Sequence, residues 1–163
     1  LEAQKALRDD LRILVMSATL DGARVASLLD SAPVIKSEGR AFHVETRYLG
    51  RDANRRIEDQ VTDAIGRAVR AERGSLLVFL PGQGEIKRVE ERLAGTVADP
   101  DIIIAPLYGA MDISAQDRAV EPAPPGKRKI VLATAIAETS LTIEGIRVVI
   151  DSGLQRVPRF EPD

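Results

Sequence analysis

The stretch Lys129–Asp151 constrains the fold more than any other part of the sequence. It contains two short apolar runs, Ile130–Ala133 and Ile146–Asp151, which are rich in Ile and Val and lack helical spacing. Such runs are typical of strands that are buried on both faces of a parallel sheet. The segment between them is dense in short hydroxyl side chains, namely Thr134, Thr139, Ser140 and Thr142. An open α/β sheet places ligand contacts in such a loop, although hydroxyls that only cap a helical turn give the same pattern.

The rest of the chain alternates between short apolar runs and amphipathic segments. Strands are expected at Ile13–Met16, Pro33–Lys36, Val44–Leu49, Leu76–Leu80 and Ile102–Ala105. Helices are expected at Gly22–Leu29, Arg55–Glu72, Glu85–Leu93 and Ser114–Val120. The alternation of strand and helix from about Val44 onward predicts an α/β fold, with a mainly parallel sheet that carries helices on both faces.

Composition excludes several classes of function. The 163 residues include no Cys and a single His, His43, so neither a disulfide nor a transition-metal site is expected. The formal net charge of −2 gives no overall attraction to nucleic acid or to anionic membranes, but it is compatible with a local basic groove. No apolar run approaches the roughly 20 residues that a membrane span needs. Charged residues of both signs make up 29% of the chain, which is typical of a cytoplasmic protein.

Four candidate functional loops each follow a predicted strand. They are Ser17–Thr19, Pro81–Gly84, Tyr108-Gly109 and Thr134–Glu144. In a doubly wound sheet such loops line one edge, so we expect them to face a common ligand surface. Their hydroxyls and glycine N–H groups can hold phosphate oxygens without reading bases, whereas turn formation alone would also explain them.

The sequence contains two segments that partly resemble known phosphate- and metal-binding motifs, but neither is a good match. A P-loop requires GxxxxGK followed by Ser or Thr, but Gly126-Lys127 is followed by Arg128, and Glu121 stands in place of the first Gly. The run Val148–Asp151 resembles a strand that ends in a magnesium-binding carboxylate, although a plain Asp at the sheet edge fits a chain without a P-loop better.

Four motifs occur in an order that resembles the DEAH-box ATP-dependent RNA helicases. They are LVMSATLD (Leu14–Asp21), LLVFLPGQGEI (Leu76–Ile86), PLYGAM (Pro106–Met111) and ATAIAETSLTIEGI (Ala133–Ile146). The segment VVIDSGLQRVPRFEP (Val148–Pro162) is similar to the bacterial HrpB-type members. The resemblance implies a RecA-like, P-loop NTPase-type three-layer sandwich, of the kind that forms the helicase C-terminal domain.

The resemblance also implies a domain division. Residues 1–30 correspond to the tail end of a first RecA-like domain and include motif III, Ser17-Ala18-Thr19, which couples nucleotide state to unwinding. Residues 31–163 correspond to the second RecA-like domain, truncated before motif VI. The missing first domain of the same chain is then an expected partner.

Site residues follow from the same resemblance. RNA-backbone contacts are expected at Gly82, Gly109, Thr134, Thr139 and Ser140, and the partner would be single-stranded or structured RNA.

Contacts to ATP are expected at Glu144, near the ribose, and at Val120. Relatives often carry an aromatic residue at the position of Val120, so stacking on the base is expected to be weak here. Ala135 stands where the family commonly has Asn, which removes one polar contact. ATP and Mg²⁺ are the implied cofactors of the parent enzyme.

The 163 residues lack the P-loop lysine, the DEAH carboxylates and the arginine-rich motif VI. Phosphoryl transfer requires these charges around the γ-phosphate, so the fragment alone is predicted to be inactive in ATP hydrolysis and unwinding. Two alternatives stay open. One is a non-catalytic doubly wound domain that binds a nucleotide or a protein, and the other is a DNA translocase, since backbone contacts alone do not settle the sugar.

Overall fold

The computed structural model describes residues 10, 12–16, 22–36, 42–135 and 143–156. The chain divides into two compact units, Leu1–Tyr48 and Leu49–Asp163. The predicted sites Ser17, Ala18, Thr19, Thr139 and Ser140 lie outside the described residues.

In the first unit the expected helix is confirmed as α2 (Gly22–Leu28), but the expected strands are wrong. Residues 13–16, 33–36 and 44–49 belong to no ladder. Their side chains are largely exposed, with Ile35 and Tyr48 each 94% accessible. A run of β-branched and aromatic residues favours an extended chain, but it becomes a strand only where a neighbour pairs with it and covers one face.

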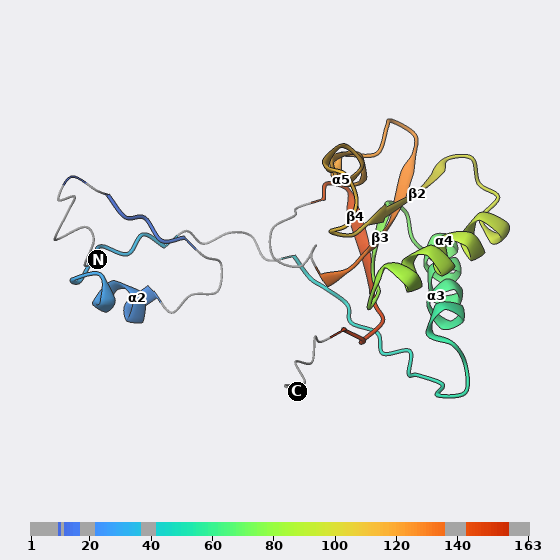
Figure 1. Ribbon diagram of the computed structural model, residues 1–163, viewed down its shortest axis with the longest axis horizontal. Coiled ribbons are helices and arrows are strands. Elements are labelled where there is room, and N and C mark those ends of the chain that lie inside the picture. The colour runs from blue at the N-terminus through green and yellow to red at the C-terminus, as the bar shows by residue number, and fades with distance from the viewer. Residues whose placement is uncertain (1–9, 11, 17–21, 37–41, 136–142, 157–163) are drawn as a thin grey trace, which may run out of the picture. The chain divides into compact units, whose positions relative to one another are not determined.

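The second unit is built on a four-stranded sheet (Figure 1). The strands are β1 (Ser75–Phe79), β2 (Ile102–Leu107), β3 (Arg128–Ala133) and β4 (Ile146–Asp151). Their order in the sheet is β2-β3-β1-β4, and every pairing is parallel. The four predicted strands from residue 76 onward are therefore confirmed.

Strand β2 runs further than the sequence indicates. Pro106 and Leu107, which read as the start of a loop, pair with Leu132 and Ala133 of β3. Proline has no N–H to donate, so in a central strand, which pairs on both sides, it removes a ladder hydrogen bond. Strand β2 lies at the edge of the sheet, where a proline is tolerated.

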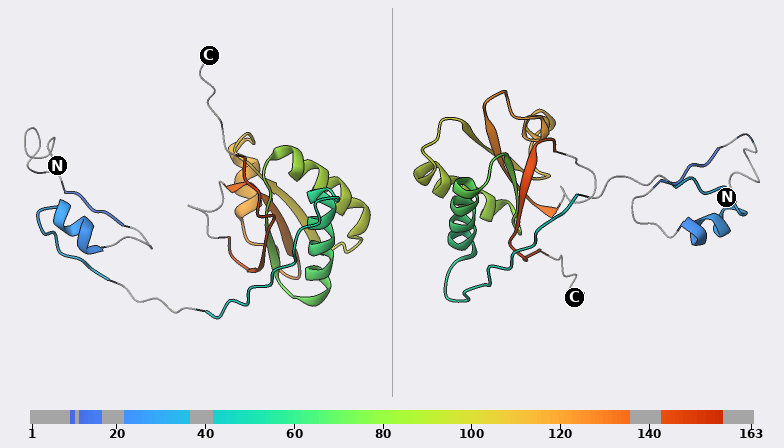
Figure 2. Two further views of the ribbon diagram at one scale, coloured as in Figure 1. Left: turned by 90° about the horizontal axis from the view of Figure 1, so that it is seen from below. Right: turned by 180° about the vertical axis from the view of Figure 1, so that it is seen from behind.

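Three helices of the described residues cover the sheet. They are α3 (Ile57–Ala71), α4 (Gln83–Thr96) and α5 (Ile113–Val120). Figures 1 and 2 show α3 and α4 side by side on one face of the sheet and α5 on the opposite face. Helix α4 is longer than expected at both ends. Gln83 and Gly84, which were expected in a turn, already belong to the helix, and it continues past Leu93 to Thr96.

Two apolar cores result from the alternation of side chains along the strands. Leu76, Val78, Ile130 and Leu132 point toward α3 and α4, where they pack with Ile65, Ile86, Val89 and Leu93. The intervening residues Val131 and Ala133 pack with Leu107, Ala119 and Ile143 on the α5 side. Strands β1 and β3 are thus buried on both faces. The expectation that Ile146–Asp151 is buried on both faces is wrong, because β4 lies at the edge of the sheet and exposes alternate residues, with Val149 59% accessible. The predicted three-layer RecA-like α/β fold is confirmed.

No helix in the described residues is both long and apolar enough to cross a bilayer.

Candidate nucleic-acid interface

Three of the predicted loops meet at the carboxyl edge of the sheet. The Thr134 N–H donates to the Leu107 carbonyl (3.2 Å), and the Leu80 N–H donates to the Ala133 carbonyl (2.8 Å). These bonds join the ends of β1, β2 and β3, because each donor lies just beyond its strand. The loops that carry Gly82, Gly109 and Thr134 therefore leave the sheet from one edge, as expected.

The loop after β2 is a tight turn that exposes Gly109. The Met111 N–H donates to the Tyr108 carbonyl (3.1 Å), so Gly109 lies in the turn and is solvent-exposed. Asp112 then caps α5 by accepting from the Ala115 N–H (2.9 Å). The pKa of the Asp112 carboxyl is lowered, first by the hydrogen bond from Ser114 and next by the one from the Ala115 backbone.

A cavity of about 420 Å³ opens at this same edge. Its walls come from the ends of three strands and are formed by Phe79, Leu80, Pro81, Thr134, Ala135, Asp151, Gly153, Leu154, Gln155 and Arg156. The Ser152 N–H donates to the Phe79 carbonyl (3.1 Å) and holds the segment after β4 against the end of β1. The Thr134 hydroxyl, the Arg156 guanidinium and the Asp151 carboxylate thus belong to residues that line one cavity.

Two further hollows lie among the described residues of the second unit. One is at the end of α3 beside Arg128 (about 340 Å³), and the other lies between α3 and the segment Thr96–Asp99 at the end of α4 (about 520 Å³). None of the predicted site residues lines either of them.

At Gly82, the N-cap of α4, a side chain would be crowded by its neighbours, although the backbone angles do not call for glycine. Its φ of −172° is extended and open to any residue. A Cβ atom at this position would lie 2.8 Å from Nε of Arg156 and 3.1 Å from Oε2 of Glu85. The absence of a side chain therefore lets the arginine lie across the start of α4.

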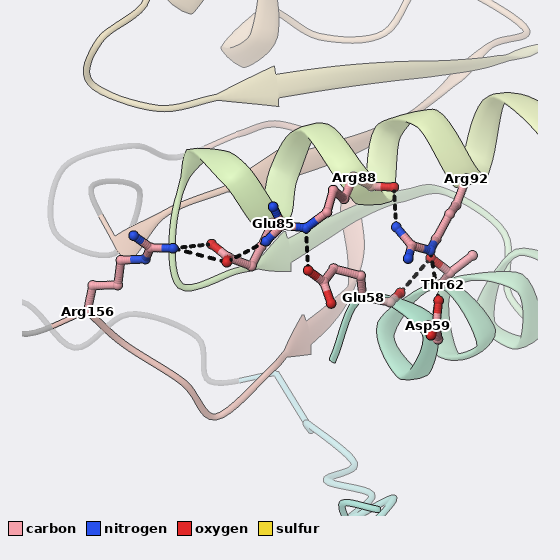
Figure 3. Close-up of polar contacts among 7 residues, drawn as sticks. All are labelled: Glu58, Asp59, Thr62, Glu85, Arg88, Arg92 and Arg156. Atoms are coloured by element: carbon pink, nitrogen blue, oxygen red, sulfur yellow. Dashed lines mark hydrogen bonds and ion pairs between the residues drawn. The ribbon is translucent and has the colours of Figure 1, made fainter. Parts of the chain in front are cut away.

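A chain of charged side chains connects the segment after β4 to both α4 and α3 (Figure 3). Nη2 of Arg156 donates to both carboxylate oxygens of Glu85, at 3.0 and 3.2 Å. Arg88 donates to Glu85 (2.7 Å) and also to Glu58 of α3. The side chains of Glu85 and Glu58 are only 11% and 8% exposed, so each carboxylate depends on these partners for its charge to be tolerated.

Titration of Glu58 reflects this pairing. Burial works to raise its pKa, but the hydrogen bonds from its own backbone N–H and from Arg88, with the attraction of the Arg88 charge, outweigh burial and hold the pKa below its ordinary value. Arg88 responds in the opposite direction, because its hydrogen bond to Glu58 raises the pKa of the guanidinium. Both groups are therefore charged at neutral pH.

The residues predicted to contact ATP lie at the other edge of the sheet. Glu144 is exposed and precedes Gly145, whose carbonyl accepts from the N–H of Ser75 at the start of β1 (3.0 Å). Val120 ends α5, and Nζ of Lys129 at the start of β3 donates to the carbonyls that flank it, those of Arg118 (2.6 Å) and Glu121 (2.7 Å).

The expectation that Thr134–Glu144 faces one ligand surface together with the other loops is therefore wrong for Glu144. Strands β3 and β4 are parallel members of one sheet, so the chain must return from the carboxyl edge to the amino edge before β4 can begin. Thr134 and Glu144 consequently lie at opposite edges.

Asp151 ends β4 and lines the carboxyl-edge cavity, where its Oδ1 accepts from the Gly153 N–H (2.8 Å). The described part of the chain holds no group of three His, Cys, Asp or Glu side chains placed to hold a metal ion.

Sequence reasoning did not identify Glu85 and Arg156 as parts of the site. The spacing of Glu85 and Arg88 on one helix is a visible signal of an ion pair. Arg156 is 71 residues from Glu85, and only the sheet order, which brings β4 beside β1, makes them neighbours.

Comparisons with known proteins agree with this geometry. The helicase conserved C-terminal domain family matches residues 56–161. The chain is 55% identical over 162 residues to the ATP-dependent RNA helicase HrpB of Escherichia coli, which covers 99% of this chain and 20% of that protein. It is 39% identical over 160 residues to the pre-mRNA-splicing factor ATP-dependent RNA helicase prp22 of Schizosaccharomyces pombe, covering 95% of this chain and 14% of that one.

Similarity extends to solved structures. A crystal structure of the Escherichia coli DEAH/RHA helicase HrpB matches with a TM-score of 0.86 and 54% identity, covering 98% of this chain and 20% of that chain. A second HrpB structure, described as a DExH-box NTPase, matches with a TM-score of 0.79 at the same identity and coverage. The chain thus spans about a fifth or less of the length of these relatives.

Proposed function

Since this chain belongs to the helicase conserved C-terminal domain family, we propose that it supplies RNA-backbone contacts and one wall of the ATP cleft in an ATP-dependent RNA helicase of the DEAH-box, HrpB type. In this proposal residues 31–163 form most of the second RecA-like domain. Residues 1–30 form the end of the first one, whose remainder is the partner across the cleft. The protein acts in the cytoplasm.

One observation carries the RNA part of the proposal, namely the convergence of three loops on the carboxyl edge. Gly109 is exposed in a turn, the hydroxyl-bearing Thr134 follows β3, and Gly82 begins α4, all at the ends of neighbouring parallel strands. Backbone N–H groups, a hydroxyl and a guanidinium are donors that suit phosphate oxygens. Contact with a sugar–phosphate backbone is the chemistry that this edge supports best.

The nucleotide part of the proposal concerns the amino edge. Val120 ends α5 close to the start of β3, and Glu144 precedes the start of β4, so both lie at this edge. The Glu144 carboxylate is exposed and can accept hydrogen bonds from ribose hydroxyls, while Val120 offers an apolar contact without an aromatic face. The two ligands would then approach the domain from opposite edges.

Hydrolysis requires groups that these 163 residues lack. ATP with Mg²⁺ supplies the phosphoryl group when it is bound between both domains, and the P-loop lysine and metal-holding carboxylates belong to the partner domain. We therefore expect the chain alone to show no RNA-stimulated ATP hydrolysis. RNA-stimulated turnover by the purified chain would contradict this division of roles.

Salt-dependent RNA binding tests the proposal directly. Fluorescence anisotropy with a labelled oligo(U) single strand, measured at several salt concentrations, should give a dissociation constant that weakens as salt rises, because each neutralised phosphate releases counterions. The same measurement with a DNA strand of equal length separates an RNA helicase from a DNA translocase, since only RNA offers the 2′-hydroxyl. Absence of binding to either strand would favour the non-catalytic alternative.

A further inference from the structure

Arg156 lies at the cavity on the carboxyl edge with part of its guanidinium engaged. Its side chain is 70% exposed, and its described contacts all run through Nη2, which holds both oxygens of Glu85. A guanidinium carries five N–H donors in a planar fork, so one nitrogen on a carboxylate leaves donors for a second acceptor. The side chain is therefore anchored and still able to bind an anion.

The anchor itself is fixed. Glu85 belongs to the first turn of α4, its side chain is nearly buried, and Arg88 holds the same oxygen that Arg156 contacts. Arg88 is held in turn by Glu58, which is buried on α3. The Glu85 carboxylate therefore cannot follow Arg156, and it determines where the guanidinium lies.

The charges of this cluster balance. The two carboxylates of Glu58 and Glu85 are matched by the two guanidinium groups of Arg88 and Arg156, and Arg92 pairs separately with Asp59 (2.8 Å). Retaining Arg156 beside Glu85 thus costs little, and the guanidinium need not leave Glu85 to meet a phosphate. An arginine already held in place loses less conformational entropy on binding than a free one.

The surroundings point to a phosphate. Arg156 lines the same cavity as Thr134, whose hydroxyl is proposed to contact the RNA backbone. The acid among the lining residues is Asp151, and one of its oxygens is turned to the Gly153 N–H. A backbone phosphate that passes between Thr134 and Arg156 would meet two donors.

We propose that Arg156 is a further phosphate contact of the RNA-binding edge and that Glu85 is the residue that positions it. This inference rests on the proposed RNA-binding function and adds a residue beyond the helicase motifs.

The test compares four variants of the full chain in the oligo(U) assay, each checked by thermal unfolding. Arg156→Gln should weaken binding about fivefold at 0.1 M salt and reduce the magnitude of the salt slope by about 0.7, the value for one phosphate on a single strand. Arg156→Lys keeps the charge and loses the fork, so it should keep the slope and weaken binding less. Arg67→Gln, on the exposed side of α3, is the control of equal charge change and should alter neither quantity.

Glu85→Gln separates positioning from charge. It keeps the Arg156 charge but loosens its anchor, so binding should weaken about twofold to threefold with the wild-type slope. Tighter binding of Glu85→Gln would mean that the carboxylate competes with RNA, and it would overturn the positioning role. A wild-type slope for Arg156→Gln would overturn the phosphate contact while leaving the proposed function standing. Failure of the wild-type chain to bind RNA would instead overturn the proposed function.

Discussion

Thr134 and Glu144 lie at opposite edges of one sheet, although they are close in sequence. Thr134 follows the carboxyl end of β3, whereas Glu144 precedes the amino end of β4 beside the start of β1. The proposed RNA edge and the proposed nucleotide edge are therefore reached by residues only ten positions apart in the chain. Two ligands bound there would be connected through one short segment.

Separation of the edges predicts separable defects. Thr134→Val removes the hydroxyl at nearly constant volume and should weaken oligo(U) binding about tenfold to a hundredfold, as expected for the loss of one hydrogen bond to a charged group. Glu144→Gln, at the opposite edge, should leave RNA binding unchanged. Anisotropy titrations of both variants check this, and equal RNA defects would contradict the separation.

Gly82→Ala should impair RNA binding without unfolding the domain. The closest atom to the new Cβ would be Nε of the exposed Arg156 side chain, which can move aside, whereas the contact with the fixed Glu85 carboxylate, at 3.1 Å, needs an adjustment of only a few tenths of an ångström. We therefore expect a stability loss of about 1 kcal/mol. Displacing Arg156 should nevertheless weaken oligo(U) binding about as much as Arg156→Gln does.

Gly95→Ala provides a matched control on the same helix. No atom lies within 4 Å of the position that its Cβ would take, and alanine favours helix over glycine by about 0.5–1 kcal/mol. This variant should therefore be slightly stabilised in thermal unfolding and bind RNA normally. A strong loss of stability in Gly82→Ala would show that the glycine has a structural role beyond making room for Arg156.

Gly74→Ala should destabilise the second unit more than Gly82→Ala does. Gly74 has φ +99°, and its Cβ would lie 2.5 Å from Cγ of Arg147 on β4. Backbone strain of about 1–2 kcal/mol then adds to displacement of the arginine stem, for a total of about 2–4 kcal/mol in the free energy of unfolding.

Gly126→Ala isolates the backbone component. Gly126 has φ +79° and open space around its Cβ position, so only the strain of about 1–2 kcal/mol should appear. Urea denaturation of the Gly74 and Gly126 variants gives the comparison. Equal losses would mean that Arg147 moves aside at no cost.

Acid should weaken the junction between α3 and α4 through Glu58. Because its folded-state pKa lies below the ordinary value of 4.5, the stability that it contributes is fully present above pH 4.5 and is lost as the pH falls through the lowered folded-state value. Glu58→Gln should cost about 1–3 kcal/mol at pH 7, because it leaves Arg88 with one buried partner fewer.

Below pH 4.5 the difference between wild type and Glu58→Gln should shrink. Subtracting the two stability curves removes the titration of the other carboxylates, including Asp112. Urea midpoints from pH 7 to pH 3 measure this difference, and a constant gap across that range would assign the loss to packing instead of charge.

Local patterns were sufficient to predict the second unit. The continuous apolar run of β3 and the amphipathic spacing of α3 each indicate how the segment is buried, so the strands, the helices and the presence of helices on both faces of the sheet followed from them. They were insufficient in the first unit, where Ile35 and Tyr48 have strand-like neighbours but no ladder.

The sequence also could not predict which residues become neighbours through the order and direction of the strands. The ion pair of Arg156 with Glu85 depends on β4 lying beside β1, and the separation of Thr134 from Glu144 depends on the direction of β4. Both are properties of strand order, which spacing along the chain does not encode. The hydroxyl and glycine residues therefore predicted which loops are candidate ligand contacts, but they did not predict at which edge of the sheet each loop lies.

Pro106 also affects how this sheet can associate with other chains. An edge strand offers a row of free N–H and C=O groups that can template the addition of a further strand, and this leads to aggregation. The proline interrupts that row on β2 while its register with β3 is kept. Among the described strands, β4 is then the edge at which an additional strand can pair without meeting a missing donor, so growth of the sheet is directed to one side.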